Sequence, residues 1–264
     1  MALRINNNVE AFNAHRQLVG TSAKVAKAME RLSSGYRINR AADDAAGLAI
    51  SEKLRSQIRG LAQSQRNSQD AVSLVQTAEG SLTEVHAMLQ RVRELAVQYK
   101  NGSLSATDQL AITSEVNQLA SEIERIGTSA AFNGIKLLNA ATTVSFQVGV
   151  NDGDVITVAT VSLGASVGTI SLAAATVIAS LDTAISSISS TRSTFGSVQN
   201  RLEYTLNNLA AYQENLVASE SRIRDVDMAD EMVNFTKLQI LQQAGTSMLA
   251  QANQAPQSVL TLLR

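Results

Sequence analysis

The chain has 264 residues, a formal net charge of −1 and no cysteine. The balanced charge argues against binding of nucleic acid, which proteins hold by neutralising phosphates, and the lack of cysteine excludes disulfides, thiolate zinc sites and cysteine nucleophiles. Hydrophobic residues make up 45% of the chain but aromatic residues only 3%, so burial must come from Leu, Ile, Val and Ala along long helix contacts, which favours an elongated, mainly helical protein.

The first predicted element is an amphipathic helix over residues 5–33, where apolar side chains recur at steps of mostly three, four and seven. Residues 35–47 show no such period, and we expect a connector there, with Asp43 or Asp44 accepting hydrogen bonds from the first amides of the next helix. No proline interrupts residues 46–99, so a helix of about 80 Å is expected at about 1.5 Å per residue.

The centre of the chain changes in character. A turn is predicted at residues 101–103, and Ser105 with Asp108 resembles a capping box that begins another helix. Between about residues 130 and 174, glycine and β-branched residues become more frequent, and apolar and polar residues alternate on both sides of residues 151–154. This pattern predicts one small β-hairpin between helical segments.

The strongest repeat follows residue 175. Its positions are spaced alternately by four and three residues over about six heptads, which predicts the seam of a left-handed coiled coil. Nine of the thirteen positions are apolar. They are Leu181, Ile185, Ile188, Arg192, Phe195, Gln199, Leu202, Leu206, Leu209, Gln213, Leu216, Glu220 and Ile223.

The two ends of the chain carry opposite charge. Residues 1–40 hold seven Lys or Arg and two Asp or Glu, whereas residues 203–235 hold two Arg and seven Asp or Glu, so we expect the ends to pair. The apolar stripes of these end segments are diluted by polar residues, so their burial is too small to offset a backbone ordering cost of about 1–2 kcal/mol per residue. We therefore expect the ends to become ordered only when they contact other copies of the chain. A head-to-tail contact that does not close then yields a filament. The predicted self-assembly seam is Ile5, Val9, Phe12, Val19, Val226, Val233, Ile240, Met248 and Leu262.

Three segments carry a resemblance to a known family. They are RLSSGYRINRAADDAAGLAIS at residues 31–51, QRVRELAVQ at residues 90–98 and SVLTLLR at residues 258–264. These segments resemble the signature sequences of bacterial flagellin, and the likeness extends over residues 1–139 and 175–264. The short centre is typical of the family's minimal form.

The resemblance implies a mainly α fold of long antiparallel coiled-coil helices forming a rod. Residues 1–43 and 226–264 would form a terminal coiled-coil domain in the filament core, and residues 44–225 a helical rod domain with the β region. It also implies a non-enzymatic subunit of the flagellar filament that serves swimming motility. A hook-filament junction protein, whose ends are related to those of flagellin, stays open as the alternative.

The resemblance further implies partners and a location. Besides itself, the chain would meet a flagellar export chaperone, the filament cap and hook-associated proteins, and it would pass unfolded through the flagellar type III apparatus. We expect it in the extracellular flagellum without a cleaved signal peptide, because residues 1–8 contain no apolar signal core. Membrane insertion is not expected, since no apolar run approaches the roughly 18 residues that span a bilayer.

Some flagellins are recognised by animal immune receptors. By resemblance, the surface for a Toll-like receptor would comprise Gln90, Arg91, Glu94, Leu95, Gln98 and Glu115. NAIP-type cytosolic sensors would read Leu260, Leu262 and Leu263. The alternative is that Leu95 is buried while Arg91 and Glu94 form a solvated face that packs on a neighbouring subunit; one surface could serve both roles.

No catalytic, cofactor or metal site is expected. His15 and His86 lack the spacing of a zinc-binding motif, and no glycine-rich phosphate loop or Ser/His/carboxylate set occurs. A secreted enzyme on a helical scaffold is disfavoured for that reason, and a membrane-active translocator by the lack of a long apolar stretch.

Overall fold

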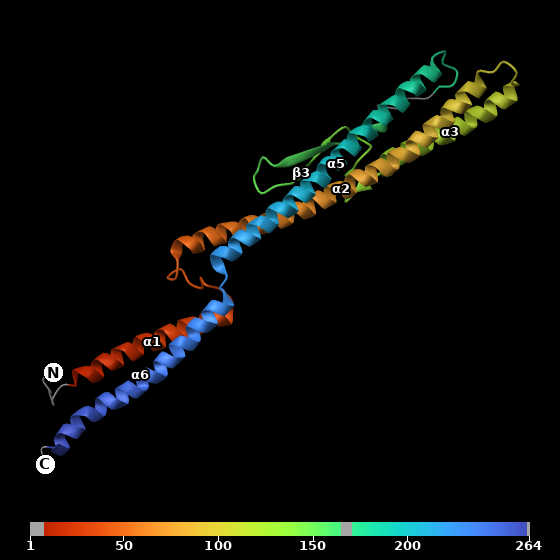
Figure 1. Ribbon diagram of the computed structural model, residues 1–264. Helices are drawn as coiled ribbons and strands as arrows, with labels where there is room; N and C mark the ends of the chain where they lie inside the picture. The colour runs from red at the N-terminus through yellow and green to blue at the C-terminus, as the bar shows by residue number, and fades with distance from the viewer. Residues whose placement is uncertain (1–7, 165–170, 263–264) are drawn as a thin grey trace. The chain divides into compact units, whose positions relative to one another are not determined.

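A computed structural model describes residues 8–164 and 171–262, with side chains as far as residue 254. The chain divides into two compact units, unit 1 of residues 1–56 with 215–264 and unit 2 of residues 57–214. The long helices and small mid-chain hairpin expected from the sequence are confirmed (Figure 1). The helices are α1 (Val9–Ser34), α2 (Ala45–Tyr99), α3 (Ala106–Ser129), α5 (Val177–Arg224) and α6 (Met228–Leu262).

Unit 2 has a continuous apolar core where α2, α3 and α5 lie side by side (Figure 1). The heptad pattern of α5 is visible in its burial, because Leu181, Ile188, Phe195 and Leu202 are buried and the polar seam residue Gln199 is half-buried. Core residues of α2 and α3 recur at similar three- and four-residue steps, as helix packing requires. The predicted seam is therefore the contact that holds α5 in this unit.

The predicted capping box begins α3. The Ser105 hydroxyl accepts from the Asp108 amide at 3.2 Å, and the Asp108 carboxylate accepts from the Ser105 amide at 3.1 Å. These bonds satisfy amides that the helix itself leaves without partners.

Two short β-hairpins lie against the helices of unit 2. The predicted one pairs β3 (Thr143–Gln147) with β4 (Val155–Ala159) in antiparallel register. The other pairs β1 (Ala131–Phe132) with β2 (Ile135–Lys136) and was not expected. Its turn is Asn133-Gly134, with φ of 48° and 81°, the positive values that a tight two-residue hairpin requires. The sequence pair Asn-Gly between apolar residues was the available signal.

Serine and threonine hydroxyls bond back to the helix backbone throughout α2 and α5. On α2, Ser68, Ser73, Thr77, Ser81 and Thr83 each donate to the carbonyl four residues earlier, at 2.8–3.1 Å. The same bond recurs on α5. These polar side chains thereby satisfy their donors without leaving the helix surface.

Unit 1 pairs α1 with α6 in antiparallel orientation. Near one end of the pair the Asn8 side chain donates to the Ala252 carbonyl at 2.7 Å, and toward the other end Arg31 and Glu231 form an ion pair at 3.6 Å. The expected pairing of the two chain ends is therefore present. Across the described helices, no stretch is both long and apolar enough to cross a membrane.

Candidate assembly surfaces and connector

The contact between α1 and α6 combines small side chains with Leu, Val and Phe. Ala28 is the buried residue of α1, and Leu238 is buried on α6. The close approach is clearest at Gly245, where an added Cβ would lie 3.3 Å from Leu18 Cδ1. We call this set the inner face; its buried or half-buried members are Ala11, Ala14, Leu18, Thr21, Val25, Ala28, Leu32, Phe235, Leu238, Gly245 and Leu249.

Several large apolar residues of both helices point away from this contact. The sequence interpretation had the apolar stripes of the two ends pack on each other, and the structure differs, since Phe12 and Val233 are both 71% exposed. The predicted seam residues with exposed side chains are Val9, Phe12, Val19, Val233, Ile240 and Met248, which we call the outer faces of α1 and α6. Val226 is half-buried beside α6; Ile5 and the side chain of Leu262 lie outside the described residues.

The physical reason for this difference is the geometry of a single pair of helices. Each helix buries only the stripe that faces its partner, and Ala and Gly within that stripe let the backbones approach closely, so apolar residues on the other sides of both helices stay exposed. Exposed apolar area of this kind marks an interaction surface when it is contiguous along an element. The inner face was missed because Ala, Thr and Gly interrupt its larger apolar residues, so its hydrophobic signal is weaker than that of Phe12, Val233 or Ile240.

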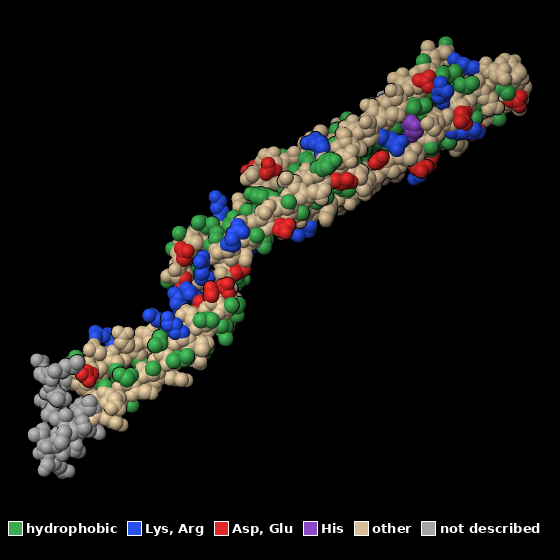
Figure 2. Space-filling model, in the orientation of Figure 1, with side chains coloured by type: hydrophobic (Ala, Val, Ile, Leu, Met, Phe, Trp, Pro, Cys, Tyr) green, Lys and Arg blue, Asp and Glu red, His purple; other side chains and the backbone are tan. Residues whose placement is uncertain are grey.

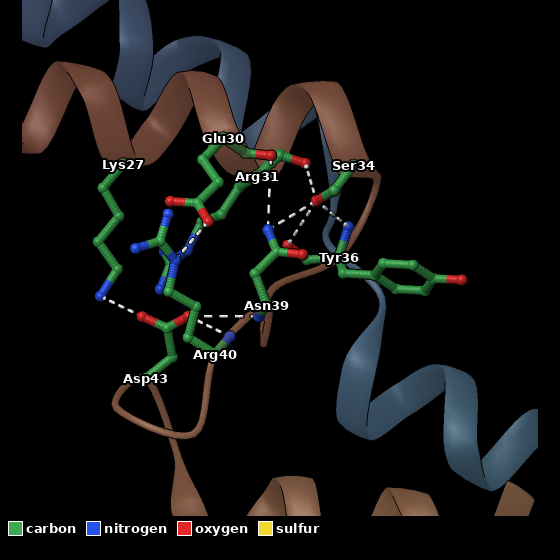
Figure 3. Close-up of polar contacts among 8 residues, drawn as sticks. All are labelled: Lys27, Glu30, Arg31, Ser34, Tyr36, Asn39, Arg40 and Asp43. Carbon is green, nitrogen blue, oxygen red and sulfur yellow. Dashed lines mark hydrogen bonds and ion pairs between the residues drawn. The ribbon is translucent and has the colours of Figure 1, made fainter.

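The connector between α1 and α2 is organised by polar contacts (Figure 3). α1 ends at Gly35, whose φ of 75° is a left-handed conformation that glycine adopts without strain. The Asp43 carboxylate then accepts from the backbone amides of Asn39 and Arg40 at 3.2 and 3.1 Å and pairs with Lys27 at 2.6 Å. These bonds fold the connector back against α1.

The same bonds set the charge state of Asp43. The Lys27 side chain, followed by the Arg40 amide, favours the carboxylate and lowers the pKa of Asp43 from 3.8 to about 2. A second ion pair, between Arg40 and Glu30 at 2.9 Å, lies beside it. The expected helix cap is also present, since the Asp44 carboxylate accepts from the Gly47 amide at 2.8 Å.

The connector is also tied to the segment between α5 and α6. Tyr36 and Asp225 form an isolated antiparallel bridge, supported by the Arg37 amide donating to the Arg224 carbonyl at 2.7 Å. The Arg224 guanidinium lies 5.0 Å from the centre of the Tyr36 ring, within the range of a cation–π contact. The connector after α1 and the segment between α5 and α6 are therefore held together at Tyr36 and Asp225.

The residues expected at a receptor surface lie in unit 2 on α2 and α3. Arg91 bonds to Glu115 at 3.0 Å and to Glu94 at 3.2 Å, and both carboxylates raise its pKa. Gln90 and Gln98 are exposed on the same helix, but Leu95 is 2% exposed and belongs to the core. The side chains that reach solvent are thus the polar ones. The side chains of Leu260 and Leu262, and Leu263 altogether, lie outside the described residues.

Metal-binding side chains form no candidate metal site in the part of the chain that the structure describes. Within the described residues, no three His, Asp or Glu side chains are placed to hold a metal ion. His86 has one ring nitrogen, Nε2, 2.9 Å from the Gln90 side chain.

Two family models match the chain. The bacterial flagellin N-terminal helical region matches residues 5–143, and the bacterial flagellin C-terminal helical region matches residues 178–263. Together they leave residues 1–4, 144–177 and 264 outside the match, and residues 144–177 contain most of the β3–β4 hairpin.

Individual proteins agree with the models. A flagellin of Halalkalibacterium halodurans is 53% identical over 98% of this chain and 99% of its own length, and a flagellar filament 33 kDa core protein of Treponema phagedenis is 49% identical over the same shares. The crystal structure of a Bacillus cereus flagellin superposes with a TM-score of 0.51 at 37% identity, covering 55% of this chain and 88% of that one. This chain therefore belongs to the bacterial flagellins, a family of structural proteins and not of enzymes.

Proposed function

We propose that this chain assembles head-to-tail into the flagellar filament through the outer faces of α1 and α6. The observation that supports this is the division of apolar residues in unit 1, where the inner face holds the two helices together while a second set of large side chains, among them Phe12 and Val233, stays exposed. Figure 2 shows hydrophobic side chains on the surface of these helices. Neighbouring copies would cover them and supply the burial that a single pair of helices lacks.

The proposal assigns different tasks to the parts of the chain. Residues 1–43 and 226–264 would form the filament core and gain most of their order on assembly, while residues 44–225 would form the outer rod. A hook-filament junction protein shares related ends and is the alternative. The similarity to flagellins and filament core proteins extends over 98% of this chain, which supports a filament subunit over a junction protein.

A seeded polymerisation assay tests the assembly surface. Phe12→Ser removes an apolar side chain from an outer face, and we expect elongation from short filament seeds to slow by about tenfold or more, because a buried Phe contributes more than about 1.4 kcal/mol. The matched control is Tyr204→Ser, which removes a 76% exposed aromatic residue from unit 2. Equal slowing in both variants would show that exposure alone, and not the outer face, decides the result.

Export, escort and location follow from the same proposal. A chain without disulfides and with a weakly packed unit 1 is easily kept unfolded, which suits passage through the type III apparatus and escort by a chaperone. The filament cap and hook-associated proteins would meet the chain outside the cell, at the ends of the filament. Secretion of this chain from a strain lacking the type III export gate would contradict this route.

A second role, sensing by a Toll-like receptor, is favoured by the exposed network around Arg91. Its guanidinium, Glu94, Gln90, Gln98 and Glu115 present charged and amide groups together on α2 and α3. We expect Arg91→Ala to lower signalling in receptor-expressing cells by about tenfold, as loss of an interface arginine commonly does. Arg93→Ala is the control, because it removes a comparably exposed ion pair, with Asp182 at 2.6 Å. Equal signalling by wild type and Arg91→Ala would end this assignment.

A further inference from the structure

Unit 1 contains a groove between the last turns of α1 and the first turns of α6. It has a volume of about 310 Å³, and four of its lining residues are the cations Lys24, Lys27, Arg31 and Lys237. Glu231 is the acidic residue that lines it. We call this feature the basic groove.

The positive charge of the basic groove is only partly neutralised. Lys27 is paired with Asp43 at 2.6 Å and Arg31 with Glu231 at 3.6 Å. Lys24 and Lys237 make no ion pair with any residue in the described part of the chain, and the buried Arg31 Nε finds no hydrogen-bond partner there. The groove therefore has two free cations and an unused donor, which suit a carboxylate or another anion.

Carboxylates that form no ion pair with a described residue lie in the same unit. Asp225, Asp227 and Asp230, which we call the acidic stretch, are exposed where α6 begins, and none of them forms an ion pair within residues 8–164 and 171–254. Asp227 uses its carboxylate to accept from the Ala229 and Asp230 amides. Figure 2 shows acidic and basic side chains close together in this part of unit 1.

The acidic stretch cannot fill the basic groove of its own molecule. Asp230 and Lys237 are seven residues apart on one helix, a rise of about 10 Å, which is beyond ion-pair distance. A second copy carries the same stretch and is free to place it in the groove. Such a contact joins two different patches and is therefore heterologous, the kind of contact that builds an open filament when the rotation between copies does not close a ring.

We propose that the basic groove of one copy receives the acidic stretch of the next copy in the filament. The inference rests on the proposed assembly function and adds to it an ionic contact, with Lys24 and Lys237 on one side and Asp225 and Asp230 on the other. The apolar outer faces supply most of the burial, while these charges select the register between neighbours and speed their encounter.

Charge reversal tests the contact. Lys24→Glu with Lys237→Glu, and separately Asp225→Lys with Asp230→Lys, should each slow elongation from wild-type seeds by about tenfold, because like charges then meet. A chain with all four changes should elongate from seeds of the same quadruple variant at a rate within about threefold of wild type on wild-type seeds, because opposite charges meet again. Lys53→Glu, at an exposed lysine of α2 in the same unit, is the control and should leave the rate unchanged.

The outcomes separate the two proposals. Far-UV circular dichroism first confirms that each variant keeps wild-type helicity. If wild-type protein does not extend seeds, the assembly function itself is wrong. If wild type extends seeds and the two double variants do so at the same rate, or if the quadruple variant is slower than both, the ionic contact is wrong. If wild-type protein binds inorganic phosphate and the charge-reversal variants do not, while all of them elongate seeds at the same rate, the groove holds a free anion and the proposed ionic contact is likewise wrong.

Discussion

Unit 2 and unit 1 are both built from long helices, but they place their apolar residues differently. In unit 2, the large aliphatic side chains of α2, α3 and α5 meet in one core, in which Leu82, Leu89 and Leu202 are fully buried. In unit 1, the inner face mixes Ala, Thr and Gly with Leu, Val and Phe, and its buried members are only Ala28 and Leu238. Several large residues of unit 1 remain outside this face.

The difference shows what each unit can do alone. A core of buried leucines stabilises unit 2 without help from other molecules, since each fully buried aliphatic side chain contributes about 1.5–3 kcal/mol. The inner face of unit 1 buries much less and leaves apolar surface to be covered. Unit 1 is therefore suited to complete its folding during assembly, whereas unit 2 is suited to fold before assembly.

The largest expected effect comes from removing one half of the helix pair. Deletion of residues 1–40 should abolish seeded polymerisation and leave unit 2 folded, because its core contains no residue of that segment. In circular dichroism, the loss should not exceed the share of α1 and α6, which are 26 and 35 residues long. A complete collapse of helicity would show that the two units are not independent.

A pair of leucine substitutions compares the two interiors directly. Leu202→Ala in unit 2 should cost about 2–5 kcal/mol, because it opens a cavity at a fully buried position. Leu238→Ala in unit 1 should cost less in the monomer, since the surrounding contact is looser and part of the site is open to solvent. Urea unfolding monitored by far-UV circular dichroism measures the loss of stability in both variants. Equal costs would mean that unit 1 is as tightly packed as unit 2.

A smaller effect is expected at the start of α3. Ser105→Ala removes the capping hydroxyl and should lower the stability of unit 2 by about 1 kcal/mol. Ser103→Ala, two residues earlier in the turn, is the control because its hydroxyl has no role in the cap. The shift in urea midpoint between the two variants isolates the cap, and no difference between them would argue against its contribution.

The smallest effect concerns the pH dependence of unit 1. The folded connector lowers the pKa of Asp43 from 3.8 to about 2, so its carboxylate stabilises the fold above about pH 4, and this contribution is lost as the pH falls through that interval. Asp43→Asn should lack this acid-sensitive component. Proteolysis of the connector with pepsin, compared at pH 4 and pH 2, reports it. The same acid response in wild type and variant would exclude Asp43 as its source.

The heptad seam of α5 and the capping box of α3 could be predicted because their signals are local. Leu181 and Leu202 recur with the helix period, and Ser105 lies three residues before Asp108. The Asn133-Gly134 turn was equally local, but the strands around it have only two residues each and show no alternation to accompany it.

The faces of α1 and α6 could not be assigned in the same way. Periodicity identifies Phe12 and Val233 as apolar and regularly spaced, but it does not say which molecule covers them. Which stripe of each helix faces the other depends on how closely their backbones approach, as at Gly245, and that distance is set by the whole unit. The polar contacts around Asp43 also depend on how the connector folds back on α1.

The hydroxyl bonds along α2 and α5 have a mechanical consequence. A carbonyl that accepts from both an amide and a serine or threonine hydroxyl is held less firmly by its own helix, and helices with such bonds bend more readily than alanine-rich ones. On α2 these sites are spread from Ser68 to Thr83. The bending stiffness of a fibre made from this chain should therefore depend in part on its serines and threonines.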